Sequence, residues 1–146
     1  MLHGIDTDFL IAVEIVDHPF HLAADHLLND LLSDGHGFVM VPQTVGEFLH
    51  VVTDARRMPS PLSMSEAIAR ARSWWEAEEV QHVFPDSVNT LSFLALMQKH
   101  RLGRKRILDT QLASILISNG IRKLITNNGT HFRSLGNLEP VSLMVR

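Results

Sequence analysis

Short apolar runs alternate with longer helix-patterned segments along most of the chain, and this alternation restricts the fold more than any other feature of the sequence. Short apolar runs bounded by glycine, proline or polar residues are typical of buried strands. We expect strands at residues 2–5, 38–41, 80–84, 123–126 and 140–144. Strands that alternate with helices form mainly parallel sheets covered on both faces. The sequence therefore predicts an α/β fold around a mainly parallel sheet of four to five strands.

The segments between these strands carry helical signals. Between residues 23 and 32, apolar side chains recur at every fourth position, as on one face of an amphipathic helix. Ser63 and Glu66 have the spacing of a capping box, which marks the start of another helix. We expect helices at residues 9–16, 23–32, 45–52, 63–75, 88–98 and 108–118, and a proline-containing loop at 56–62.

Composition narrows the class of protein. The chain has 146 residues, of which 45% are hydrophobic and 20% charged, as expected for one globular domain over residues 1–146. The absence of cysteine excludes disulfides and thiolate metal sites. No apolar run approaches the ~20 residues of a membrane helix, and the first residues lack a signal-peptide pattern, so we expect a cytoplasmic protein. The net charge of −3 argues against bulk electrostatic coating of nucleic acid, but not against local contacts with phosphates.

Three acids occupy positions that a parallel sheet would bring together. Asp6 directly follows the first expected strand, Glu47 comes about one helical turn after the second, and Asp109 opens the helix that precedes the fourth. Ligand sites in such sheets lie beyond the carboxyl ends of the strands. Two carboxylates about 4 Å apart repel by roughly 4 kcal/mol at an effective dielectric of 20. A hard divalent cation such as Mg²⁺ relieves that repulsion, so the three acids suggest a metal site.

Each acid also has a structural alternative. Asp6 could simply cap a helix, Glu47 could form a capping box with Thr44, and Asp109 could interact with a helix dipole. Against the last alternative, Asp109 continues a helical face that is otherwise apolar, formed by Ala113, Leu116 and Ile117. A carboxylate on a buried face is costly unless it is paired or bound to a metal.

Four segments, in order along the chain, resemble the motifs of PIN-domain ribonucleases, in particular the VapC-like toxins of bacterial toxin–antitoxin pairs. They are DTDFL at residues 6–10, PQTVGEF at 42–48, LDTQLAS at 108–114 and a threonine-containing closing segment at 120–132. Each motif alone is degenerate, whereas four with the expected spacing are fairly specific. The resemblance covers essentially the whole chain.

The resemblance implies a PIN-like three-layer α/β/α sandwich and a Mg²⁺-dependent endoribonuclease in which Mn²⁺ can substitute. Asp6, Glu47 and Asp109 would form the acidic site, with Asp6 and Asp109 as metal ligands. Thr126 and Asn128 would position water or substrate. The implied partners are an RNA substrate, a cognate antitoxin protein and a second copy of the chain in a homodimer, with no membrane.

The sequence departs from the family pattern in the closing segment. The family's fourth acid usually lies between Thr126 and Phe132, where this chain has Asn128 and His131 in the corresponding places. Asparagine offers a neutral oxygen and histidine a nitrogen, so the site carries less negative charge. This departure bears on activity more than on fold.

Several other polar residues are candidates for binding. Thr7 and the basic residues Arg104 and Lys105, just before Asp109, could contact the RNA, although a basic run is as often an ordinary solvated turn. Arg56 and Arg57 are weaker candidates. The irregular spacing of His18, His21 and His26 argues against a zinc site. Trp74 and Trp75 fit the core or a partner surface better than a base-stacking platform.

Two other functions compete with the nuclease. The first is a PIN-like RNA- or protein-binding domain that has lost activity, which the missing fourth acid supports. The second is a phosphatase of the haloacid-dehalogenase type, suggested by the DxD pattern at residues 6–8. Such phosphatases need an acidic pair after a later strand, and residues 126–128 supply none.

Overall fold

A wholly parallel, five-stranded sheet forms the centre of the computed structural model, which describes residues 1–143. The strand order is β3-β2-β1-β4-β5. The strands are β1 (Leu2–Ile5), β2 (Gly37–Met40), β3 (Val80–His82), β4 (Lys123–Ile125) and β5 (Glu139–Val141). The predicted parallel sheet is confirmed. The end of the last predicted strand, Met144, lies outside the described residues.

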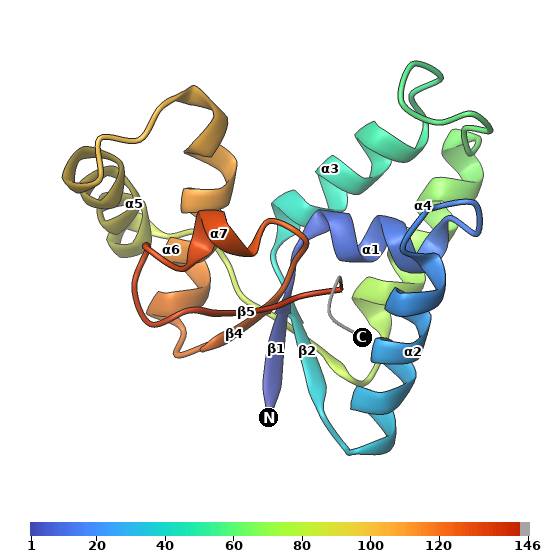
Figure 1. Cartoon of the computed structure of the whole chain (residues 1–146), viewed down its shortest axis with the longest axis horizontal. Coiled ribbons are helices and arrows are strands. Elements are labelled where there is room, and N and C mark those ends of the chain that lie inside the picture. The colour runs from blue at the N-terminus through green and yellow to red at the C-terminus, as the bar shows by residue number, and fades with distance from the viewer. Residues whose placement is uncertain (144–146) are drawn as a thin grey trace.

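Helices cover both faces of the sheet, which confirms the three-layer PIN-like sandwich. In Figure 1, α1 to α4 lie on one side of β1 and β2, and α5, α6 and α7 lie on the other. No helix within residues 1–143 is both long enough and apolar enough to cross a membrane. The helices are α1 (Thr7–Glu14), α2 (His21–Ser33), α3 (Pro42–Val52), α4 (Met64–Glu76), α5 (Ser87–Lys99), the short 3₁₀ helix η1 (Arg104–Arg106), α6 (Ile107–Ser118) and α7 (Gly129–Phe132).

Most of the helices begin earlier than the sequence predicted, and α1 and α3, which carry residues of the candidate site, show why. The α1 helix starts at Thr7 because the Asp6 side chain caps it by accepting a hydrogen bond from the Thr7 amide. The α3 helix starts at Pro42, whose fixed φ suits the first helical position. These starts bring polar side chains close to the strand ends that precede them.

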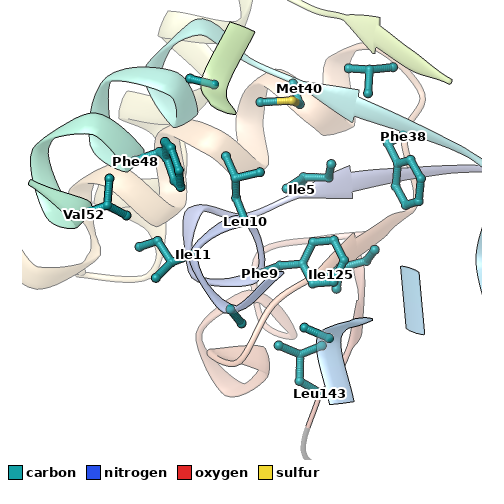
Figure 2. Packing of buried hydrophobic residues seen from close by; sticks show 14 of the residues in the cluster. Ile5, Phe9, Leu10, Ile11, Phe38, Met40, Phe48, Val52, Ile125 and Leu143 are labelled. Carbon is teal, nitrogen blue, oxygen red and sulfur yellow. The ribbon is translucent and has the colours of Figure 1, made fainter. Parts of the chain in front are cut away.

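Apolar side chains from alternate strand positions fill a separate core on each face of the sheet. On β2, Phe38 and Met40 point into the core beneath α1 to α4, and Val39 points into the core beneath α6. Figure 2 shows the first core, with Phe9 and Leu10 of α1 near Ile5. Because α1 is held by this core, the residues of its first turn have fixed positions.

Gly4 allows α6 to approach the central strand closely. A Cβ atom at Gly4 would lie 2.7 Å from a Leu116 methyl carbon of α6, which is too close. The same helix carries Asp109 in its first turn. The contact therefore fixes α6 against β1, the strand that ends immediately before Asp6.

Candidate active site

The neighbouring strands β1 and β4 end side by side, and their following residues meet there. Ile5 pairs with Ile125, and the Asp6 amide donates to the Ile125 carbonyl at 3.2 Å. The Thr126 hydroxyl, buried just beyond β4, donates to Asp6 Oδ2 at 2.7 Å. Two residues that are 120 positions apart in the sequence thus share one hydrogen bond at the carboxyl edge of the sheet.

Asp6 lies at the centre of this group and is only 7% exposed. Burial raises the pKa of its carboxyl group to about 8, helped by the charges of Asp8 and Asp109, although hydrogen bonds from Thr126 and Thr7 oppose the rise. Asp6 therefore caps α1, as the structural alternative proposed. It is also an acid whose pKa is strongly raised by its surroundings. Perturbed acids of this kind cluster at functional sites.

Asp8, which was not among the predicted site residues, also belongs to this group of acids. Its Oδ2 accepts a hydrogen bond from the backbone N–H of Asn127 at 2.8 Å, and its Oδ1 is buried without a hydrogen-bond partner. Burial raises the pKa of Asp8 to about 6. The available signal was the DxD pattern itself, because two acids at the start of one helix can both face the neighbouring strand end.

Glu47 does not belong to a capping box, so that structural alternative is wrong. The α3 helix starts at Pro42 with Val41 as its cap residue and no side-chain capping bond, which places Glu47 beyond the first turn. Instead, the Thr7 hydroxyl donates to Glu47 Oε2 at 3.3 Å. Burial raises the pKa of Glu47, and the charge of Asp109 adds to the effect. Glu47 therefore faces the same group of acids.

Asp109 closes the group from the other face of the sheet and is paired with a histidine. The Nδ1 atom of His131, on α7, lies 3.0 Å from Asp109 Oδ2. The Asp109 side chain is 21% exposed and that of His131 is 33% exposed. This side of the acidic group is thus the side that solvent can reach.

The rest of the closing segment contributes backbone donors. The Asn128 side chain is exposed, and the backbone N–H of Asn128 donates to the Thr126 hydroxyl at 3.0 Å. The Asn128-Gly129 turn begins α7, which carries His131 back toward the acids. Of the two residues at the family's fourth-acid places, His131 is the one whose side chain contacts an acid of the group.

Two of the basic residues precede the helix that carries Asp109. Arg104 and Lys105 are exposed on η1, immediately before α6 and its Asp109. Arg57 pairs with Asp54 at 3.7 Å in the loop after α3, which leaves it less available for a phosphate. Contacts between RNA and Thr7, Arg104 or Lys105 remain predictions.

The donor set suits a hard divalent cation. The four acids offer carboxylate oxygens, the ligands that Mg²⁺ and Mn²⁺ accept, and the unpartnered Asp8 Oδ1 is free to bind one. Within residues 1–143, no three histidine, aspartate or glutamate side chains are already arranged tightly enough to hold an ion. An ion would therefore have to draw these carboxylates together, which is consistent with their mutual repulsion.

The histidines and tryptophans near the first helices have structural contacts. The Phe20 amide donates to His18 Nδ1 at 3.0 Å, and His21 Nδ1 lies 2.9 Å from the Ala12 carbonyl oxygen. Trp74 packs edge-on against Phe9 and Phe38, and Trp75 stacks on His82. These contacts tie the two histidines and the two tryptophans to neighbouring parts of the fold.

No protein-family model matches the sequence, and no curated protein matches it significantly. Solved structures do match the fold. VapBC2 from Rickettsia felis, bound to promoter DNA, matches with a TM-score of 0.69 at 17% identity, covering 97% of this chain and 98% of that chain. VapC20 from Mycobacterium tuberculosis, a toxin that cleaves the sarcin–ricin loop, matches with a TM-score of 0.69 at 15% identity, covering 95% and 98%.

VapBC-1 from nontypeable Haemophilus influenzae matches over nearly the full length of both chains. The TM-score is 0.65 at 18% identity, covering 99% of this chain and 100% of that chain. At these identities the likeness concerns the fold, and it spans every layer described above. The chain therefore has the PIN-like α/β/α fold of these toxin structures.

Proposed function

We propose that this protein is a metal-dependent endoribonuclease that acts as the toxin of a toxin–antitoxin pair. One observation carries the proposal: carboxylates from α1, α3, α6 and the end of β1 converge at the carboxyl edge of a PIN-like sheet. The fold that the chain shares with VapC structures supports the same activity.

Repulsion among the acids gives the site a reason to bind a cation. The pKa of Asp6 is raised to about 8 and that of Asp8 to about 6, chiefly by burial, so near neutral pH the fully ionised group is unfavourable. A divalent cation compensates that charge. Asp6, Asp8, Glu47 and Asp109 would hold Mg²⁺ or Mn²⁺.

The roles of the residues follow from their contacts. A divalent cation at such a site supplies a more acidic water and neutralises charge on a phosphodiester. Thr126 orients Asp6 through its 2.7 Å hydrogen bond, and Thr7 holds Glu47 in the group. Arg104 and Lys105 would bind RNA phosphates beside Asp109, and the exposed Asn128 would position water or substrate.

The proposed partners are RNA, an antitoxin protein and a second copy of the chain. The matched structures include a toxin–antitoxin complex from Klebsiella pneumoniae, and VapC20 is a toxin that cleaves the sarcin–ricin loop. A protein partner is also supported by the apolar surface of α5, where Val88 is 70% exposed, Leu91 65% and Leu94 55%.

Cleavage of RNA by the purified protein tests the proposal. Mixed ribosomal and transfer RNA would be incubated with Mn²⁺ or Mg²⁺, with and without EDTA. We expect cleavage that EDTA and Asp6→Asn abolish and that Asp17→Asn, which changes an exposed acid in the loop after α1, leaves unchanged.

Two results would contradict the proposal. Cleavage that persists in EDTA, or in folded Asp6→Asn protein, would exclude the metal mechanism. RNA binding without cleavage, under any divalent ion, would favour the inactive PIN-like binding domain instead.

A further inference from the structure

The contact between His131 and Asp109 adds a nitrogen to a group that otherwise offers oxygens. The short helix α7 begins directly after the turn that follows β4, and it carries the imidazole to 3.0 Å from Asp109 Oδ2. The Asn128 side chain is exposed, and only its backbone amide is tied to the acid cluster, through Thr126. The closing segment thus brings an imidazole, and not an amide oxygen, to the acids.

Imidazole changes which ions a site prefers. Mg²⁺ prefers oxygen ligands and sheds its water reluctantly, whereas first-row transition-metal ions accept imidazole together with carboxylates. The Nδ1 atom lies 3.0 Å from Asp109 Oδ2, which is about the separation of two neighbouring ligand atoms on one ion, so Nδ1 and the carboxylate can bind the same ion side by side.

The His131 side of the site is open to solvent. Asp6 is 7% exposed, whereas the side chains of Asp109 and His131 are 21% and 33% exposed.

We propose that His131 is a nitrogen ligand of the metal site, and that the site therefore selects a first-row transition-metal ion over Mg²⁺. The inference rests on the proposed function, since it concerns the same site. It goes further in naming the class of ion and the residue that selects it.

Mn²⁺ serves as the probe, because pulsed electron paramagnetic resonance detects nitrogen bonded to it. The experiment compares the wild type with His131→Asn, which keeps an N–H donor for Asp109, and with His131→Asp, which restores a carboxylate. His26→Asn, on the exposed face of α2, is the matched control. Calorimetry on the same proteins gives the Mn²⁺ and Mg²⁺ affinities, and circular dichroism verifies the fold.

We expect a bound-nitrogen signal in the wild type and in His26→Asn, and none in either His131 variant. The preference for Mn²⁺ over Mg²⁺ should fall about tenfold or more in His131→Asp. A wild-type spectrum without bound nitrogen, or a nitrogen signal that persists in His131→Asn, would overturn the inference.

A separate variant distinguishes the two proposals. If Asp6→Asn weakens Mn²⁺ binding but no nitrogen is bound, His131 only orients Asp109 and the proposed nuclease stands. If Mn²⁺ affinity is the same in Asp6→Asn as in the wild type, the metal site itself is wrong, and both proposals fall.

Discussion

The two edges of the sheet each bury a titratable group, with opposite consequences. At the carboxyl edge, burial raises the pKa of Asp6 to about 8. At the amino edge, His3 is 3% exposed beside His36, and burial lowers the pKa of His3 to about 4. The cause is the same at both edges, because burial favours the neutral form of any group.

The two edges differ in the protonation state of their buried groups near neutral pH. His3 is neutral there without difficulty, and the nearby positive charges of Lys123 and the N-terminus would oppose a bound cation. Asp6 and Asp8 titrate close to neutral pH and repel each other. A divalent cation would relieve charge repulsion only at the carboxyl edge. For this reason we assign the proposed function to that edge.

The largest expected effect is a difference in RNA-cleavage activity between a variant at the carboxyl edge and one at the amino edge. Asp109→Asn should lower kcat/KM for RNA cleavage at least about 100-fold, because it removes an acid of the proposed metal site. His3→Gln should leave the rate within about twofold, since no charge of the reaction falls at the amino edge. Single-turnover cleavage with excess enzyme measures both. Similar losses in the two variants would mean that the edges do not differ in function.

The second effect concerns the stability of the metal-free protein. A carboxyl group with a raised pKa in the folded state contributes fully at low pH, and that contribution is lost as the pH rises from about 4 through about 8. Asp6→Asn keeps an N-cap acceptor and should therefore be more stable than the wild type at pH 8 by about 1–3 kcal/mol. Urea unfolding in EDTA measures this. A less stable variant at pH 8 would show that Asp6 is chiefly a structural cap.

The third effect should have the opposite pH dependence at the amino edge. A histidine with a lowered pKa in the folded state gives stability that is complete above about 6.5 and is lost as the pH falls through about 4. Between pH 7 and pH 4, His3→Gln should lose about 1–2 kcal/mol less stability than the wild type. The check is urea unfolding across that range, and parallel curves for the two proteins would contradict it.

The smallest effect tests the mouth of the acidic site. Asn128→Asp adds a charge near the acids, but the side chain is exposed, so solvent screens it. We expect Mn²⁺ to bind more tightly by less than about 1 kcal/mol. Calorimetry at fixed pH and salt detects a change of that size. Equal or weaker binding would indicate that the side chain at 128 points away from the ion or that His131 holds the fourth place instead.

The fold followed from the sequence because it depends on patterns that are local. The apolar run at residues 2–5 identifies a strand, and the apolar residues at every fourth position between 23 and 32 identify a helix. The alternation of such strands and helices along the chain indicates a parallel sheet. Boundaries were less accurate, because the start of α3 at Pro42 depends on backbone geometry that apolar spacing does not report.

The site was only partly predictable for a related reason. Asp6 and Asp109 were predicted from their places at a strand end and on an apolar helix face. Asp8 was missed because its partner, the Asn127 amide, lies 119 positions away in the sequence. The contact of His131 with Asp109 was likewise hidden, since it depends on the direction in which α7 leaves the sheet.

Calorimetric titration of Mn²⁺ into the wild type and Asp6→Asn, at pH 7 and equal salt, tests the central claim most directly. If the carboxyl-edge acids hold the ion, the wild type should bind one Mn²⁺ per chain, and Asp6→Asn should bind it at least about tenfold more weakly. Equal affinity in the two proteins, or no binding by the folded wild type, would contradict the account.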